Sequence, residues 1–205
     1  MKFTSTALLL PALALAAPIE QNMEARASSG PFTLMSVRSA SPIHFGQINA
    51  SGRGFYIGKP TATYCPTGVQ NLDCTQLNNS TTSLITSSVG EASSAGMNTI
   101  VPGGQSLYVE KTGALGYTQA HSASIPTGAY TTGFIYTAPT SADQPWGHLS
   151  FTAGGATGLV ACPTAANPNI YQIFANVKGL KNADKCLGFD AFAIPYSGTA
   201  AWQYT

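Results

Sequence analysis

Apolar residues are grouped along this chain in a way that leaves little choice of fold class. They occur in short runs rich in Thr, Tyr, Phe, Ile and Val, which Gly, Pro and Asn separate. No segment keeps a 3.6-residue apolar period over the length of a helix, so the pattern predicts an all-β protein. About a dozen strands are expected, at residues 32–37, 43–48, 55–57, 83–86, 97–101, 107–110, 114–118, 133–137, 148–151, 158–162, 171–175 and 191–194. The Ser-rich segment 87–95 is expected to be a loop.

Three hairpin-like segments recur along the chain at nearly regular distances. Ile43, Asn98 and His148 occupy comparable points in them, with separations of 98 − 43 = 55 and 148 − 98 = 50 residues. Three such units with flanking strands predict a closed barrel of about twelve short antiparallel strands, similar to a β-trefoil. Closure would also hide the sheet edges, which a chain with only 8% charged residues cannot protect with charges. A Greek-key β-sandwich is the alternative, because the units resemble one another only weakly.

The N-terminus predicts export. Residues 1–16 are predicted to be a signal peptide, because they have a positive charge at Lys2, an apolar run that starts at residue 7 and extends to residue 17, and small residues before the expected cleavage site. The segment 17–26 is expected to be either a short pro-segment clipped at Arg26 or a disordered arm. Residues 27–205, which number 205 − 26 = 179, are expected to form a single all-β domain. No later stretch is long and apolar enough for a membrane helix, so we expect a secreted protein without a membrane partner.

The four cysteines indicate disulfides rather than catalysis. In an oxidising compartment an even number of cysteines predicts two bridges. Of the three possible pairings we favour Cys65–Cys74 and Cys162–Cys186, because each closes a local, polar loop. The chain has no CxxC motif and its three histidines lie far apart in sequence, so no metal site is expected.

Charge and motif content exclude several classes of function. A net charge of +1 argues against binding to nucleic acid or to an anionic membrane. Residues 27–205 hold six acidic residues, and Glu110 lies in EKTG, which predicts a solvated hairpin turn rather than one of the two facing carboxylates of a glycosidase. The chain lacks a GxSxG motif. We therefore expect no enzyme activity, no catalytic residue and no cofactor, and a secreted hydrolase is the least favoured interpretation.

Two kinds of residue remain as candidates for interaction with carbohydrate. The sequons at Asn49 and Asn79 are acceptors for N-glycosylation, and we expect at least one to be modified. A sequon at Asn78 overlaps that of Asn79, so we expect only one of that pair to be used. For the aromatic rings in or near turns and strand ends we favour a place in the core, and stacking on sugars is the alternative for each ring. The candidates are Trp146, Tyr117, Tyr130, Tyr136 and Trp202. Trp146 is the first choice, because it stands between Pro and Gly in a turn context.

Several strings also resemble a known family. QSLYVEKTGALGYTQ, WGHLSF, LVACP, IYQIFA and ADKCLGFDAFAI resemble, in the same order, motifs of the fungal cell-wall protein PhiA family. The resemblance runs from about residue 32 to 194. It implies a secreted, glycosylated wall protein linked to phialide and conidium development, with no assigned catalytic residue, and some family members are IgE-binding allergens.

The expected function combines both lines of inference. We expect a non-enzymatic, secreted structural and developmental glycoprotein of the fungal cell wall, with wall polysaccharide or wall glycoproteins as partners. The alternative is an extracellular carbohydrate-binding, lectin-like module for glucan or chitin.

Overall fold

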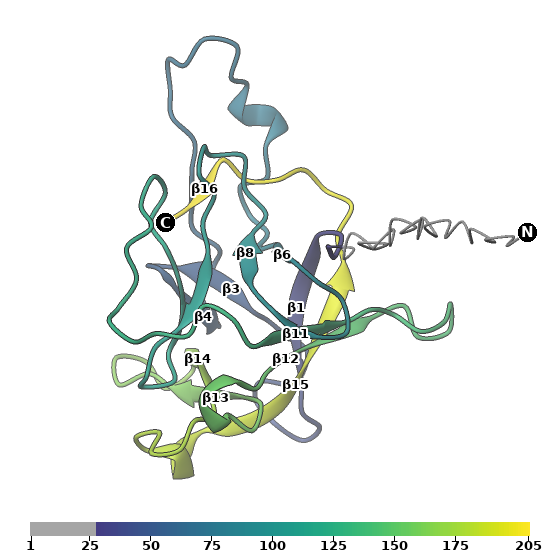
Figure 1. Ribbon diagram of the computed structural model, residues 1–205, viewed down its shortest axis with the longest axis vertical. Helices are drawn as coiled ribbons and strands as arrows, with labels where there is room; N and C mark the ends of the chain where they lie inside the picture. The colour runs from purple at the N-terminus through teal and green to yellow at the C-terminus, as the bar shows by residue number, and fades with distance from the viewer. Residues whose placement is uncertain (1–27) are drawn as a thin grey trace, which may run out of the picture.

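The computed structural model describes residues 28–205, which form 16 β-strands and three short 3-10 helices (Figure 1). The strands are β1 Phe32–Val37, β2 Gly46–Gln47, β3 Asn49–Ser51, β4 Gly54–Ile57, β5 Thr63–Tyr64, β6 Leu84–Thr86, β7 Ala92–Ser93, β8 Ala95–Met97, β9 Leu107–Val109, β10 Leu115–Tyr117, β11 Phe134–Thr137, β12 Gly147–Phe151, β13 Leu159–Pro163, β14 Tyr171–Ala175, β15 Leu187–Pro195 and β16 Gln203–Tyr204. The helices are η1 Cys74–Gln76, η2 Ala153–Gly155 and η3 Ala183–Lys185. The predicted all-β class is confirmed. The predicted signal peptide and the segment 17–26 lie outside the described residues.

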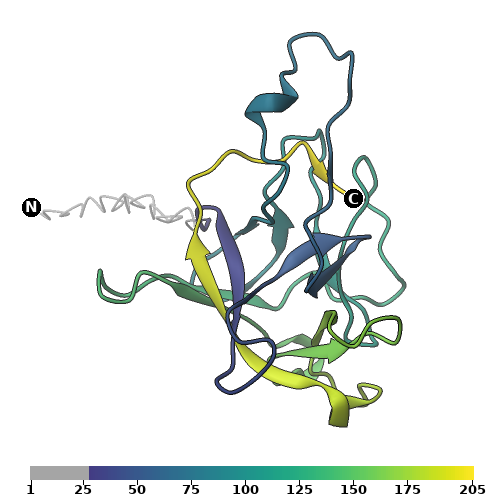
Figure 2. The ribbon, with the colours of Figure 1, turned by 180° about the vertical axis from the view of Figure 1, so that it is seen from behind.

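Fourteen of the strands form one sheet. Its main path runs β7-β11-β12-β15-β13-β14-β4-β10-β9, and β1, β2, β3, β6 and β8 branch from it. The long strand β15 joins its parts, because it pairs with β1 over residues 190–195, with β12 over 191–193 and with β13 over 187–189. Both views show β1 lying beside β15 (Figure 1, Figure 2). Strands β5 and β16 form a separate two-stranded sheet.

The predicted closed, trefoil-like barrel is wrong, because the sheet is open and its main path ends at β7 and β9. The spacing of 55 and 50 residues is not a structural repeat. Residues 147–162 do not form a hairpin: β12 pairs with β11 and β15, whereas β13 pairs with β14 and β15. The two end strands have only two and three residues, so the open edges are short and offer little backbone for unwanted pairing.

One hydrophobic core fills the inner side of the sheet. Strand β1 shows how it is built, since Phe32 and Leu34 point inward and are buried, while Thr33 and Met35 alternate with them and are half-buried on the outer side. This is the period-two alternation of a strand with one covered face. The largest fully buried side chains are those of Tyr117, Tyr204, Phe32, Phe55, Phe134 and Phe151.

Several predicted strand positions need correction. Residues 43–45 form a turn and not a strand, with Phe45 at a φ of 57°. Strand β8 ends at Met97, so the strand expected at 97–101 is displaced towards the N-terminus. The segment 87–95, expected to be a loop, contains β7, which pairs with β11.

The last strand, β16, is held by side chains as well as by its short ladder. The Gln105 side-chain amide donates hydrogen bonds to the carbonyl oxygens of Thr118 (2.8 Å) and Tyr204 (3.0 Å). Its Oε1 atom accepts from the backbone N–H of Tyr204 at 2.8 Å. A buried glutamine with its amide satisfied in this way stabilises a two-residue strand that its own backbone bonds would hold weakly.

Candidate functional site

Three neighbouring strands, β1, β15 and β12, present an apolar outer surface. Along β15 the small residues Ala191 and Ala193 are buried, so the larger Phe192 between them faces outward and is half-buried. Met35 of β1 and His148 of β12 lie opposite Phe192 in the two ladders. Cross-strand neighbours on one face lie within contact distance, so these three side chains form a row across the sheet.

Trp146, immediately before β12, covers one end of this row. Its ring lies parallel to that of Phe192, with centroids 5.4 Å apart and an interplanar angle of 13°. The imidazole of His148 meets Phe192 edge-on at 4.9 Å and 77°. Trp146 is half-buried, so one ring face rests on Phe192 and part of the indole remains accessible.

A shallow pocket of about 390 Å³ opens beside this stack. None of its lining residues carries a charge. A surface of this kind can hold an apolar face, such as the C–H face of a pyranose, against an aromatic ring. The lining residues are Met35, Pro145, Trp146, Phe192, Ile194 and Pro195. We call this surface the Trp146 face.

The other predicted sugar-stacking rings are placed differently. Tyr117 and Tyr136 lie in the core, 0% and 6% exposed, which corrects their assignment as surface rings. Tyr136 stacks on Phe32 with centroids 4.7 Å apart. Tyr130 and Trp202 are half-buried, and Tyr130 packs edge-on against Phe151. Core packing, the interpretation favoured for each ring, therefore holds for Tyr117 and Tyr136.

The hydroxyl of Tyr117 is buried but satisfied. It donates to the carbonyl oxygen of Thr205 (3.0 Å) and accepts from the backbone N–H of Arg53 (3.2 Å). Burial of the ring disfavours the phenolate and raises the pKa of Tyr117 to about 12. Burial also raises the pKa of Tyr204 above its usual value.

The remaining chemical candidates have structural positions. The four cysteines form the favoured bridges, Cys65–Cys74 and Cys162–Cys186. The carboxylate of Glu110 accepts from the hydroxyl of Thr112 at 3.1 Å, in a turn between β9 and β10. Within residues 28–205, no group of three or more His, Cys, Asp or Glu side chains could hold a metal ion. No helix in the described part of the chain is long and apolar enough to cross a membrane.

Comparison with known proteins places this chain among secreted proteins. Residues 32–205 match the family described as PhiA-like secreted protein. The chain belongs to this family. A relative from Arthroderma benhamiae, whose description reads "Uncharacterized secreted protein", is 39% identical over 210 residues, which cover 98% of this chain and 97% of the relative. No solved structure matches the chain. The resemblance noted in the motifs is confirmed, and the protein is secreted.

Both predicted sequons of this PhiA-like chain have defined surroundings. Asn79 is exposed in the loop between η1 and β6. The side chain of Asn78 caps that loop, since its Oδ1 atom accepts from the N–H groups of Ser80 and Thr81. Asn49 is half-buried on β3, where its amide donates to the carbonyl oxygen of Lys59 at 2.7 Å. Of the two asparagines, Asn79 is the more accessible.

One member of the Trp146 face, Phe192, was not expected from the sequence. Its strand reads Ala191-Phe192-Ala193-Ile194, with small and large residues in alternation. The usual inference puts the large side chains inside, but here β1 and β12 flank β15 closely and the alanines face inward. The sequence signal for this arrangement is the strict alternation of alanine with large apolar residues, because it places all the large side chains of the strand on one face.

Proposed function

We propose that this secreted protein is a non-enzymatic structural and developmental glycoprotein of the fungal cell wall, held there by binding neutral polysaccharide. The observation that carries the proposal is the stack of Trp146 on Phe192 at the outer surface of β12 and β15. The family description and the fungal relative support an extracellular place of action. The developmental role follows from the resemblance to the PhiA family and forms part of the proposal.

The chemistry of the Trp146 face favours an uncharged sugar polymer. Its lining offers an indole, a phenyl ring, aliphatic groups and two prolines, and it offers no charge. Neutral glucan and chitin present alternating C–H faces and hydroxyl groups, so a stacked ring gives them affinity without an ion pair. His148 at the edge of Phe192 supplies ring nitrogens that can hydrogen-bond a sugar hydroxyl.

The non-enzymatic part of the proposal rests on the carboxyl groups. The six acidic residues of the domain lie on separate segments, namely Asp73, Glu91, Glu110, Asp143, Asp184 and Asp190. Glycoside hydrolysis uses two carboxyl groups that face each other across the scissile bond. The Glu110 carboxylate is engaged by Thr112 in its own turn, which favours a structural place for it.

A pull-down on purified fungal β-glucan and chitin tests the proposal. We expect the unaltered protein to be retained, Trp146→Ala to be released, and Tyr64→Ala to behave as unaltered. Tyr64 is a suitable control because it is 53% exposed on β5, outside the Trp146 face. If Trp146→Ala is retained as well as the unaltered protein, Trp146 is not the stacking residue and the protein is held in the wall by other contacts. Absence of retention of the unaltered protein would refute polysaccharide binding, and turnover of a glycan or ester substrate would refute the non-enzymatic assignment.

A further inference from the structure

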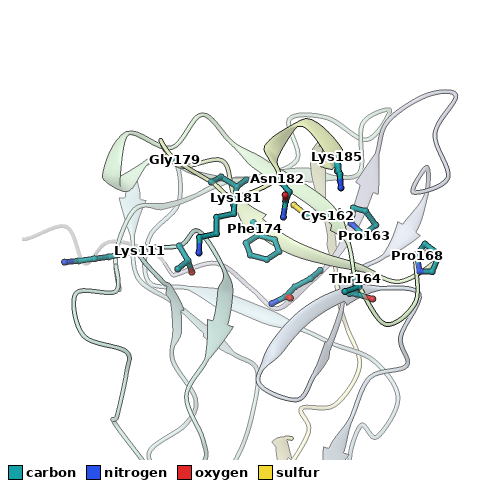
Figure 3. Close-up of a pocket in the computed structure, with 14 residues that line it drawn as sticks. Lys111, Cys162, Pro163, Thr164, Pro168, Phe174, Gly179, Lys181, Asn182 and Lys185 are labelled. Atoms are coloured by element: carbon teal, nitrogen blue, oxygen red, sulfur yellow. The ribbon is translucent and has the colours of Figure 1, made fainter.

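A second cavity lies on another part of the sheet. It has a volume of about 770 Å³ and lies between the end of β13, the outer face of β14 and residues 179–185, which include η3 (Figure 3). It shares no lining residue with the Trp146 face. Any ligand of this cavity is therefore bound independently of the stack proposed above.

An aromatic ring occupies the centre of the cavity. Phe174 is half-buried on the outer side of β14, because its neighbours Ile173 and Ala175 point into the core. Figure 3 shows the Phe174 ring in the middle of the lining side chains, with Lys181 and Asn182 on one side and Thr164 on the other. A ring surrounded by amide, hydroxyl and amino groups provides both an apolar platform and hydrogen-bond partners for one sugar unit.

The cavity concentrates positive charge in a chain that carries little of it. Lys111, Lys181 and Lys185 line it, which is three of the nine Lys and Arg residues of the whole sequence, and no Asp or Glu lines it. Lys181 lies beside the ring, whereas Lys111 extends away from it (Figure 3) and lies against Gly128. The carboxylates nearest in sequence are Asp184 and Glu110, beside Lys185 and Lys111, and neither belongs to the lining.

Covalent and hydrogen-bonded links hold the walls in place. The disulfide Cys162–Cys186 ties the end of β13 to the residue that follows Lys185. On the opposite wall the Thr164 hydroxyl donates to the carbonyl oxygen of Asn167 at 2.8 Å. A site whose walls are already ordered loses less conformational entropy when a ligand binds.

The cavity also continues along the sheet. Gln172 lines it and also lines a neighbouring groove of about 450 Å³ that contains Arg53, Tyr56, Tyr108 and Glu110. Gln172 lies opposite Tyr56 in the β14–β4 ladder, so the two hollows meet across adjacent strands. Two adjoining hollows fit a polymer better than a single small molecule.

We infer that this cavity binds an anionic sugar unit of a polysaccharide, a hexuronate or a phosphorylated hexose, with its ring on Phe174 and its acid group at Lys181, while Lys185 on the other side of the ring adds to the positive charge (Figure 3). Asn182, Gln172 and Thr164 lie where they can hydrogen-bond the hydroxyl groups of that unit. The ligand differs in charge from the neutral polymers proposed for the Trp146 face, so binding at the cavity depends on salt whereas binding at the Trp146 face changes little with it. Binding at the cavity weakens as salt rises, since exposed charge pairs are screened.

Calorimetric titration with defined oligosaccharides tests this inference. The probes are oligogalacturonate, phosphomannan oligosaccharide, neutral chito-oligosaccharide and inorganic polyphosphate. We expect the Lys181→Met/Lys185→Met double variant to lose about tenfold in affinity for an anionic oligosaccharide. Lys178→Met is the matched control, because Lys178 is an exposed lysine of the same segment outside the cavity lining, and it should bind as the unaltered protein does. The stronger of the two anionic oligosaccharides identifies carboxylate or phosphate as the acid group.

Three results would overturn the inference. One is an unchanged affinity in the double lysine variant; another is an unchanged affinity in a folded Phe174→Leu variant, which would show that the ring makes no contact. The third is binding of polyphosphate as tight as that of the anionic sugars, which would indicate a site for charge alone. The titration with chito-oligosaccharide tests the Trp146 face separately. If the proposal for that face fails, the titrations with anionic oligosaccharides still test this cavity.

Discussion

The indole ring of Trp146 lies parallel to the phenyl ring of Phe192, with the ring centroids 5.4 Å apart, on the outer side of the sheet. The two residues are 46 positions apart in sequence (192 − 146) and meet because β12 and β15 pair through Ala191 and Ala193. The stack is therefore a product of the sheet register, and its exposed side is available to a ligand.

Replacement of Trp146 by alanine should change stability only slightly. The half-buried ring contributes a stacked pair worth about 1 kcal/mol, which corresponds to a fall in the melting temperature of about 3 °C for a domain of this size. Phe151→Ala serves as the comparison, because Phe151 is fully buried and its loss should cost about 3–5 kcal/mol. Thermal unfolding followed by circular dichroism measures both, and an equally large loss in the two variants would place Trp146 in the core.

Alkaline pH should destabilise the fold through Tyr117. In the unfolded chain its hydroxyl ionises near its ordinary pKa of 10.0, and in the folded chain burial raises that pKa to about 12. Between these values the unfolded state has lost a proton that the folded state keeps, so the free energy of unfolding falls as pH rises. Below pH 10 this contribution is fully present.

Denaturant unfolding at a series of pH values checks this expectation. Tyr117→Phe is the control, since it lacks the titrating hydroxyl and should lose less stability between pH 10 and 12 than the unaltered protein. Titration of all nine tyrosines with one midpoint near 10 while the protein remains folded would contradict the account.

The strands were largely predictable from the sequence because their signals are local. Residues 32–37 and 171–175 were expected as strands and form β1 and β14 with the same bounds. Runs of β-branched and aromatic residues between turn residues identify such segments without knowledge of their partners. The failure at 43–45 is also local, since Phe45 has a positive φ that a bulky side chain rarely adopts.

The sheet order and half of the candidate site could not be predicted, because both depend on distant partners. Phe32 lies opposite Pro195 in the β1–β15 ladder, and no sequence pattern near either residue predicts that pairing. Trp146 was expected at the surface from its flanking Pro and Gly, whereas Phe192 faces outward only because β1 and β12 flank its strand. The two-residue strands β5 and β16 were not predicted. Strand β16 depends on hydrogen bonds with Gln105, which is far away in sequence.

The two disulfides should contribute unequally to stability. Their sequence separations are 24 for Cys162–Cys186 and 9 for Cys65–Cys74. In the chain-entropy treatment the longer loop gives the larger effect, roughly 3–4 kcal/mol against roughly 3 kcal/mol or slightly less. Urea unfolding of the Cys162→Ala/Cys186→Ala and Cys65→Ala/Cys74→Ala variants measures the difference. A free Cys162 thiol, or a peptide linking Cys65 to Cys162, in the non-reduced digest would refute the pairing.

Glycosylation should be found at Asn79. Its side chain is exposed in a loop, so an attached glycan displaces nothing, and Asn79→Gln should remove one glycan mass with an unchanged melting temperature. Asn49→Gln is the comparison, because it disturbs the bonds of Asn49 to Lys59 and Thr61 and should lower the melting temperature. Enzymatic deglycosylation in heavy-oxygen water marks the occupied site by mass. A label at Asn49 with none at Asn79 would be the opposite of what we expect.

Emission from Trp146 itself tests the proposed wall contact most directly. The chain contains two tryptophans, so Trp202→Phe leaves Trp146 as the single reporter. Titration of this variant with soluble β-glucan and chitin oligosaccharides should produce a saturable change in emission that is nearly the same at low and high salt, because apolar contacts are not screened. An unchanged Trp146 signal under conditions where the same variant is retained on the insoluble polysaccharide would contradict the account.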